Sequence, residues 1–473
     1  MATEADHFQD NTDTLAPSSE GNKTPSLPSS ELGSHSKQED PEKAALPTKP
    51  QQQQTPSPVE AAAKPTANDA AAIPDGGFQA WLQVACGFML FFNTWGLLNT
   101  FGVFQTYYES GQLFSESSSN ISWIGAIQTF CLLCVGFITG PVFDRGYLKT
   151  LLGIGTFGVV FGFMMLSLSK TFWECLLAQG FCVGIGCGCL FVPGVAILPT
   201  YFRRKLGLAI GLAASGSSTG GIIYPIVFYR LVNQIGFGWS VRVLGFLALG
   251  TLLLPISCMK MRVKPLRARA LIDQTVFTDW PFITFIIGTV IGFIGIYVML
   301  FYISYFGLEQ KITNASLSFY LVPILNAASI FGRTLPNALS DKVGPLNLII
   351  PGALICGIIN FCMISVHDLG GIVVSALAFG FFSGVFIGLP PVCFAMLTKD
   401  KTKVGTRMGM GFSFIAGSVL AGAPGSGDIL QNYTKDLNWT GIWLYGGISN
   451  VVAAAVFLAL RIWKAGSKLN VKI

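Results

Sequence analysis

The chain has 473 residues, of which 51% are hydrophobic and only 11% are charged. Average soluble proteins carry about 25% charged residues, so this composition excludes an ordinary soluble protein. The net charge of +6 is unevenly placed, because residues 1–73 carry a net charge of −6 and the remainder carries +12. An acidic N-terminal segment therefore precedes a long, apolar and basic remainder.

The acidic segment, residues 1–73, is rich in Pro, Ser, Gln and Ala and has almost no aromatic residues. Stretches such as "QQQQTPSP" and "AAAKPTANDAAA" cannot bury enough apolar surface to offset the entropy that is lost on ordering. We expect this segment to be a disordered tail.

Apolar runs recur from Ala80 onward, and each is long enough to cross the hydrocarbon core of a bilayer (~30 Å) as a helix. The runs lack the regular charged faces of amphipathic helices in soluble proteins. They predict an all-α membrane protein with twelve transmembrane helices, at residues 80–107, 120–141, 148–168, 172–198, 206–232, 241–259, 281–306, 316–339, 346–366, 370–396, 406–430 and 441–463. The lipid bilayer is then one of the partners of this chain.

The twelve runs divide into two sets of six on either side of a basic segment. We expect the following organisation: a six-helix half at 74–259, a basic loop at 260–280, a second six-helix half at 281–465 and a short tail at 466–473. The fourth run carries Gly180, Gly184 and Gly188 at a spacing of four, which predicts a smooth helix face for close packing.

Basic residues concentrate in alternate loops. Nineteen Lys and Arg lie in or beside the loops that follow the even-numbered helices, whereas the opposite loops hold only three lysines. Because positively charged loops stay in the cytosol, both termini are predicted to be cytosolic. We expect the plasma membrane as the location, with the vacuolar membrane as the alternative.

Glycosylation sequons fit this orientation. Four of the five Asn-x-Ser/Thr sequences fall in the predicted outer loops, and we expect these four asparagines to be candidate glycosylation sites: Asn120, Asn314, Asn432 and Asn438.

Two pairs of similar segments suggest a duplicated six-helix unit. Asp144–Arg145 and Asp341–Lys342 follow the second and eighth helices and are 197 residues apart, and the segments 216–221 (GSSTGG) and 417–422 (GSVLAG) are 201 residues apart. Parallel repeats of this kind are typical of carriers whose substrate site lies between the halves. The four charged residues are gate candidates that pair in one state and separate in the other, although static surface pairs are the alternative.

A polar stripe runs along the eighth predicted helix. Its members are spaced by three or four residues and include one arginine: Asn326, Ser329, Arg333, Asn337 and Ser340. Such a stripe at membrane depth should face the bundle interior or a water-filled cavity. We expect Arg333 to bind an anionic or polar group of a small-molecule substrate, because its guanidinium fork suits a carboxylate. Snorkelling to the interface and a structural ion pair with Asp144 or Asp341 are the alternatives.

Further residues are candidates for the lining of the same pathway, although ordinary helix packing explains each of them equally well. They are Asn93, Gly96, Asn99 and Thr100 in the first helix, Tyr297, Tyr302 and Tyr305 in the seventh, and Ser383 in the tenth.

Motifs for catalysis or cofactor binding do not occur. We find no nucleophile–base constellation, phosphate-binding loop or metal-ligand spacing, and most of the eleven cysteines lie inside predicted helices. No histidine lies in a predicted helix, and no mid-membrane carboxylate offers a proton carrier. The sequence therefore predicts a protein that is not an enzyme, with no metal, cofactor or nucleic-acid partner, and it leaves the oligomeric state open.

Five segments carry a family resemblance: "PDGGFQAW" (74–81), "NTFGVFQTYYE" (99–109), "YFRRKLGLAIGLAASGSSTGG" (201–221), "NAASIFGR" (326–333) and "GTRMGMGF" (405–412). With them the chain resembles the monocarboxylate transporters, specifically the fungal branch of that family within the major facilitator superfamily. The resemblance implies the major facilitator fold and movement of small organic acids by alternating access, either facilitated or linked to protons. Some fungal relatives move other metabolites, riboflavin among them.

The resemblance holds at only one of three coupling positions. In the proton-coupled lactate carriers a lysine in helix one and an acid–arginine pair in helix eight couple transport to protons; these positions are Asn99, Ser329 and Arg333 in this chain. Only the arginine is present. We therefore expect a secondary transporter of a small, anionic organic acid or related metabolite, with proton symport unsupported. A carrier of a neutral or aromatic metabolite and a non-transporting membrane sensor are the alternatives.

Overall fold

The computed structural model describes residues 75–203, 205–262, 270–400, 403–431 and 437–466, and the side chains of residues 315 and 341 lie outside the description. All described residues belong to one unit of the chain, residues 64–473. The expected tail at 1–73 lies outside the described residues, as do residues 467–473 of the second tail.

Helices are the only regular secondary structure of the described residues, which form no strand, and this confirms the predicted all-α class. The α-helices are α1 (Phe78–Asn93), α2 (Trp95–Asn99), α3 (Phe101–Glu109), α4 (Ser118–Asp144), α5 (Leu148–Leu166), α6 (Phe172–Cys175), α7 (Gly184–Ala196), α8 (Leu206–Cys258), α9 (Trp280–Glu309), α10 (Ala315–Val343), α11 (Pro345–Cys362), α12 (Leu369–Gly388), α13 (Pro390–Leu397), α14 (Val404–Gln431) and α15 (Trp439–Ala465). A π-helix, η2 (Leu176–Val183), joins α6 to α7, and short 3-10 helices are η3 (Leu198–Thr200), η4 (Gln274–Thr278) and η5 (Met363–Ser365).

These helices make twelve passes across the bundle within the described residues, because α8 turns back at Gly236. Ten segments are long and apolar enough to cross a membrane, and α8 is one of them. With 53 residues, α8 would be about 80 Å long if it were straight, but its backbone turns at Gly236 (φ 76°) and supplies two passes. The turn brings its two ends together, since the Tyr201 hydroxyl donates to the carbonyl oxygen of Lys260. The more polar α10, which is eighth in chain order, completes the twelve passes.

The first pass is not a continuous helix, although the sequence predicts one. It breaks at Thr94 (φ −107°, ψ −83°) between α1 and α2. The Asn93 carbonyl there accepts a hydrogen bond from the thiol of Cys187 on α7, and the Thr94 hydroxyl donates to the carbonyl oxygen of Leu90. Non-helical backbone is tolerated at membrane depth where the protein satisfies its polar groups in this way.

Glycines set the closest helix contacts, as the spacing of the fourth run predicts. A Cβ at Gly184 would lie 2.8 Å from the backbone oxygen of Gln128 on α4, and Gly180 and Gly188 face the same helix. On α10, a Cβ at Gly332 would overlap the carbonyl oxygen of Phe381 on α12. Small residues at these points let the backbones approach directly.

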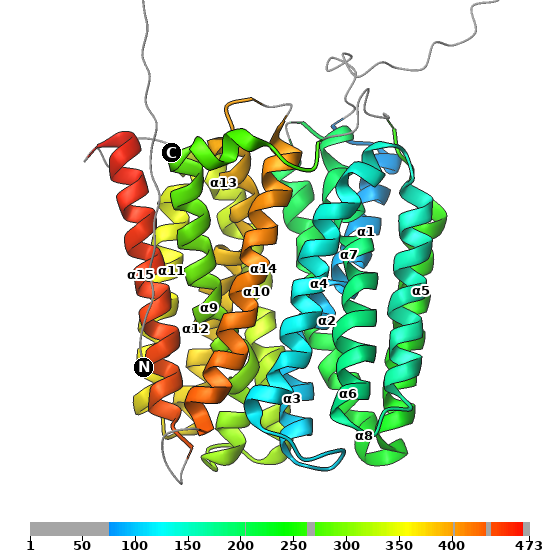
Figure 1. Cartoon of the computed structure of the whole chain (residues 1–473), viewed down its shortest axis with the longest axis vertical. Helices are drawn as coiled ribbons and strands as arrows, with labels where there is room; N and C mark the ends of the chain where they lie inside the picture. Colours follow the sequence, from blue (N-terminus) through cyan, green and yellow to red (C-terminus); the bar gives the residue numbers. More distant parts are fainter. Residues whose placement is uncertain (1–74, 204, 263–269, 401–402, 432–436, 467–473) are drawn as a thin grey trace, which may run out of the picture. The chain divides into compact units, whose positions relative to one another are not determined.

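Helices α1–α8 and α9–α15 gather into two neighbouring sets, which Figure 1 colours from blue to green and from green to red. The sets meet where α4 packs on α14, α8 on α10 and α3 on α9. Within the sets, α8 packs on α1 as α14 packs on α9, which fits the expected duplication of a six-helix half. The end of the bundle where α1 and α9 begin, at the top of Figure 1, is called the predicted cytosolic end, and the opposite end is the predicted outer end.

Candidate functional site

The predicted polar stripe of α10 faces the interior of the protein. All five of its side chains are buried: Asn326, Ser329, Arg333, Asn337 and Ser340. Arg333 is only 4% exposed, so its guanidinium does not extend to the surface of the bundle. Snorkelling is therefore not the reason for this arginine.

Arg333 is held by two hydroxyl groups. Its Nε donates to Oγ of Ser329 one turn earlier (3.2 Å), and its Nη1 donates to Oγ of Ser217 on α8. Ser217 belongs to the GSSTGG segment, which the resemblance also contains. The arginine thus connects α10 to α8, one from each set of helices.

The charge of Arg333 is not neutralised by an acidic side chain among the described residues, because the two hydroxyl contacts are the only hydrogen bonds of its guanidinium there. Hydroxyl groups offset only part of the solvation that a buried cation loses, and the remaining penalty is several kcal/mol. The arrangement is therefore poised to accept a negative charge from outside the chain.

An asparagine pair extends this cluster toward the first pass. Nδ2 of Asn99 on α2 donates to Oδ1 of Asn326 on α10 (3.1 Å). A Cβ at Gly221 of α8 would lie 2.6 Å from the side-chain carbon of that amide, so only glycine leaves room for it. We call Asn99, Ser217, Asn326, Ser329 and Arg333 the Arg333 cluster.

An aromatic side chain lies beside the cluster. Tyr297 on α9 is buried and lies near Arg333 and next to Thr129 on α4. The cluster thereby has neighbours from α2, α4, α8, α9 and α10. These are helices of both sets, as expected for a site between two halves.

Three other predicted lining residues make contacts elsewhere. Asn93 accepts from the Tyr224 hydroxyl (2.6 Å) and donates to Thr251, which fixes α1 to both legs of α8. The Ser383 hydroxyl donates to the carbonyl oxygen of Gly380 in its own helix. Tyr302 lies between α4 and α14 at the predicted outer end.

The predicted outer end is closed between α4 and α14. The Ser119 hydroxyl donates to the carbonyl oxygen of Pro424 (3.1 Å), and Nε2 of Gln431 donates to Oγ of Ser118 (3.1 Å). The Tyr302 hydroxyl donates to the carbonyl oxygen of Ala423 (3.3 Å). Near this end, Glu109 on α3 is half-buried and accepts a hydrogen bond from Nε2 of Gln105 (2.8 Å), a carboxylate that the sequence analysis did not single out.

The gate candidates differ in their exposure. Asp144 is buried at the end of α4, whereas Arg145 and Lys342 are exposed, and the side chain of Asp341 lies outside the described residues. Both turns pass through a glycine with positive φ, Gly146 and Gly344 (96° each). The pairing of these charges in a gate stays a prediction.

Two of the predicted glycosylation asparagines cap helices. Asn314 accepts from the backbone N–H of Leu317 at the start of α10, and Asn438 accepts from that of Gly441 at the start of α15. Asn120 is exposed in the first turn of α4 and donates to Glu116, and Asn432 lies outside the described residues. The caps explain two of these asparagines without a glycan, and modification stays a prediction.

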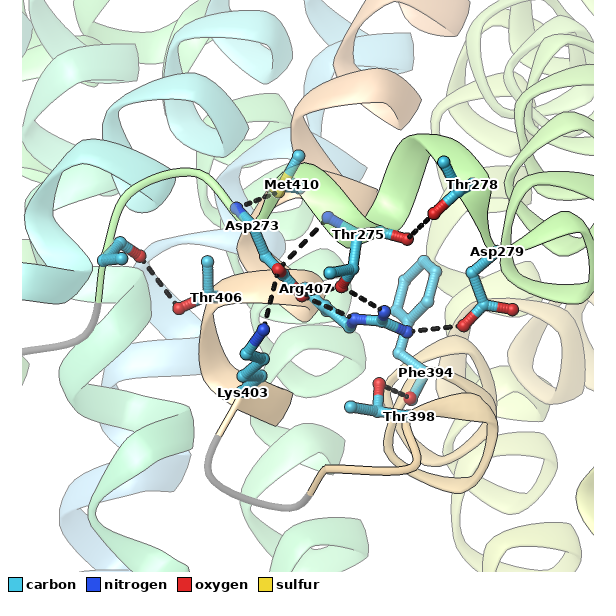
Figure 2. Close-up of polar contacts among 11 residues, drawn as sticks. Asp273, Thr275, Thr278, Asp279, Phe394, Thr398, Lys403, Thr406, Arg407 and Met410 are labelled. Atoms are coloured by element: carbon cyan, nitrogen blue, oxygen red, sulfur yellow. Dashed lines mark hydrogen bonds and ion pairs between the residues drawn. The ribbon is translucent and has the colours of Figure 1, made fainter. Parts of the chain in front are cut away.

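A buried ion-pair network at the predicted cytosolic end was not expected from the sequence (Figure 2). Arg407, in the first turns of α14, donates from Nε to Asp273 (2.9 Å), from Nη1 to Asp279 (2.7 Å) and from Nη2 to Thr275 (2.8 Å). Lys403 adds a second contact to Asp273 (3.0 Å). We call these five residues the linker clasp, because they fasten the segment 270–279, which leads into α9, onto the start of α14.

The electrostatics of the linker clasp are strongly favourable. Burial alone would raise the pKa of the Asp273 carboxyl, but the hydrogen bonds from Arg407, Thr275 and Lys403 outweigh it and hold the pKa well below its usual range. Asp273 and Arg407 are each 7% exposed. The sequence feature that could have indicated the linker clasp is the pair of aspartates within a basic segment, together with Arg407 in the segment "GTRMGMGF".

An apolar chamber opens between α4, α7 and α14 toward the predicted cytosolic end. Its volume is 260 Å³, and its walls include Phe137, Phe191, Val195, Met408 and Phe412. Ala270 and Leu271, the residues just before the linker clasp, close one side. Helices α4 and α14 are in contact at the predicted outer end and again beside the chamber, where a Cβ at Gly409 would lie 2.9 Å from the ring of Phe137.

Comparison with known families agrees with the fold. The family described as Major Facilitator Superfamily matches residues 81–423. The chain is similar to the crystal structure of the nucleoside transporter NupG, with a TM-score of 0.63 at 15% identity, over 80% of this chain and 99% of the other. It is also similar to a POT family transporter in complex with 5-aminolevulinic acid, with a TM-score of 0.64 at 14% identity, over 84% and 99%.

Relatives with higher sequence identity are fungal. An MFS-type transporter of Emericella nidulans, dbaD, is 60% identical over 81% of this chain and 86% of its own length. The Aspyridones efflux protein apdF of Emericella nidulans is 34% identical over 81% and 79%. The Agnestins efflux protein AgnL12 of Paecilomyces divaricatus is 35% identical over 83% and 90%.

Proposed function

This chain belongs to the Major Facilitator Superfamily and is a multi-pass membrane transporter of that type, and we propose that it exports an organic anion from the cytosol by alternating access. The anionic group binds at the Arg333 cluster. The resemblance to the fungal branch of the monocarboxylate transporters is part of this proposal.

The observation that carries the proposal is the burial of Arg333 with hydroxyl groups as its partners. A bound carboxylate would replace the solvation that the guanidinium has lost and would accept two parallel N–H···O bonds. A neutral ligand would leave the positive charge uncompensated. Electrostatics therefore favour an anionic substrate.

The substitutions at the coupling positions support a substrate that brings its own charge. Asn99 and Ser329 stand where the lactate carriers place a lysine and an acid, and each is hydrogen-bonded within the Arg333 cluster. An internal acid would compete with a substrate anion for Arg333. With serine in that position, the guanidinium has neutral hydroxyl partners, which a substrate carboxylate can displace.

Export is the proposed direction because two of the relatives are described as efflux proteins. The opening toward the predicted cytosolic end is compatible with loading from the cytosol. It does not by itself decide the direction, since an alternating-access carrier visits both states in every cycle. With both termini in the cytosol and the chain in the plasma membrane, the product would leave the cell.

A second candidate is a carrier of a neutral aromatic compound. It is favoured by Tyr297 beside Arg333 and by the phenylalanines of the chamber, which offer stacking surfaces. The two candidates differ in whether the exported compound carries an acid.

Comparative analysis of the culture medium tests the proposal. Fungal cells that express the chain, cells that lack it and control cells that express an inactive variant are grown in separate, parallel cultures. Compounds in the medium and in the cells are quantified by mass spectrometry. We expect at least one organic acid to accumulate outside the expressing cells and inside the others. Accumulation of neutral compounds alone would overturn the anion proposal in favour of the second candidate.

A further inference from the structure

The apolar chamber has no assigned role in the site around Arg333. Of the residues that line it, Thr406 is the only one with a hydroxyl group, and that hydroxyl already donates to the carbonyl oxygen of Ala270 (2.8 Å). The remaining walls are aliphatic, aromatic or glycine. Water gains few hydrogen bonds in such a space, and apolar cavities are accordingly favourable places for apolar ligands.

The chamber is the right size for part of a substrate. Ligand pockets for drug-sized molecules typically measure about 300–1,000 Å³. At 260 Å³, the chamber is just below that range and accommodates one ring system rather than a whole elongated molecule. Among the described residues that line the chamber, no side chain carries a positive charge for an acid group, which should therefore bind elsewhere.

The chamber also lies on the way to the Arg333 cluster. Thr129 of α4 is next to Tyr297, and Leu133, the first chamber residue of α4, is one turn closer to the predicted cytosolic end, about 6 Å along the helix. A ligand with its ring in the chamber can therefore extend an acid group toward Arg333 along the face of α4.

Both sets of helices contribute walls. Phe191 and Val195 come from α7 in the first set, and Met408 and Phe412 come from α14 in the second. The rings of Phe191 and Phe412, which both line the chamber, are in edge-to-face contact with centroids 5.7 Å apart, so one wall joins the two sets. A ligand placed here touches both sets at once, so its binding changes when the sets move relative to each other.

We propose that this chamber is a second subsite, which receives the apolar or aromatic body of the exported anion on the cytosolic side of Arg333. The substrate is then an amphiphilic acid, with a ring system in the chamber and its anionic group at the Arg333 cluster. This inference rests on the proposed function for the role of Arg333, but the chamber itself would bind a neutral ring equally well.

Two fluorescent probes separate the subsites. Dansylglycine carries a naphthalene ring and a carboxylate, and dansylamide carries the same ring without the carboxylate. The purified full chain in lipid nanodiscs is titrated with each probe, and empty nanodiscs provide the background of probe dissolved in lipid. We expect saturable fluorescence enhancement with both probes and tighter binding of dansylglycine.

Variants that fill the chamber should weaken the binding of both probes. Val195→Phe on α7 should reduce the affinity for each probe by about tenfold or more, equivalent to loss of ring burial. Ile185→Phe, on the exposed side of the same helix, is the matched control and should bind as the wild type does. Met408→Trp fills the chamber from α14 and replaces Val195→Phe if that variant does not fold, as judged by thermal unfolding.

The outcomes distinguish the two proposals. Absence of saturable binding to the wild type, or unchanged binding of both probes to Val195→Phe and Met408→Trp, would overturn the chamber subsite. Arg333→Lys should weaken the binding of dansylglycine but not the binding of dansylamide. If Arg333→Lys affects neither probe while the chamber variants affect both, the chamber subsite stands and anion recognition by Arg333 fails.

Discussion

The linker clasp depends on the guanidinium of Arg407. Replacing Arg407 by Met keeps most of the apolar stem and removes the guanidinium that joins Asp273, Asp279 and Thr275. Both aspartates then lose a cationic partner, and Asp273 is 7% exposed. The segment 270–279 should consequently separate from α14 more often.

The magnitude is large because the contacts are buried. Removing one partner of a buried ion pair costs about 3–5 kcal/mol, since an uncompensated charge stays behind. Lys403 also contacts Asp273, but its side chain is 42% exposed. Its replacement by Met should cost about 0–1 kcal/mol, as for other exposed pairs, and Lys403→Met is therefore the matched control.

Hydrogen–deuterium exchange of the backbone of 272–279 measures this local opening directly. A loss of about 3 kcal/mol or more should accelerate exchange by over about a hundredfold in Arg407→Met, because each 1.4 kcal/mol is a factor of ten. Lys403→Met should change exchange by less than about tenfold. Equal protection in the wild type and Arg407→Met would show that the clasp does not hold the linker.

Three further predictions concern pH, packing and the Arg333 cluster. The Asp273 carboxyl has a lowered pKa, so it stabilises the folded state at every pH above its ordinary pKa of about 3.9 and loses that effect only as the pH falls through the lowered pKa. The exchange protection of 272–279, corrected for the intrinsic exchange rate, should therefore be constant between about pH 8 and pH 5. A change of this protection near neutral pH would contradict the argument. Gly332→Ala should lower thermal stability by about 1–3 kcal/mol because its Cβ overlaps the carbonyl oxygen of Phe381, while Gly417→Ala, with nothing within 4 Å, should not; equal melting curves would refute the close α10–α12 contact. Ser329→Asp should place a carboxylate beside Arg333 Nε and reduce export of the anion by about tenfold or more, whereas Ser329→Ala should export the anion as the wild type does. Undiminished export by the aspartate variant would argue against binding of the substrate anion by Arg333.

The passes and the polar stripe were predictable because their signals are local. Hydropathy over about 20 residues is enough to locate a membrane helix, and spacings of three and four residues are enough to place Arg333 on one face with Ser329. The same local reading missed the break at Thr94, which depends on Cys187 of another helix satisfying the freed carbonyl. It did separate the two legs of α8, predicted at 206–232 and 241–259, which meet at the non-helical turn at Gly236.

The linker clasp was not predictable because its partners are distant in the chain. Arg407 and Asp273 are 134 residues apart, and nothing in the composition of a basic loop indicates which of its acids will be buried. Asn93 shows a related limit: its polar side chain in an apolar helix predicts a pathway residue, and in the structure it bonds Tyr224 and Thr251 within one set of helices, so its place in the pathway stays a prediction. A polar residue at membrane depth needs a partner, and sequence alone does not say whether that partner is a substrate or another helix.

The most direct measurement of the proposed anion site is the export rate of the organic acid identified in the medium, compared between the wild type, Arg333→Lys and Arg242→Lys. Arg242 is the matched control because it lies over the ring of Trp239 and bonds Ser167, away from the Arg333 cluster. We expect export to fall by about tenfold or more in Arg333→Lys, which keeps the charge but loses the fork, and to be unchanged in Arg242→Lys, at equal amounts of protein in the membrane. Wild-type export by Arg333→Lys would contradict the assignment of Arg333 as the anion-binding residue.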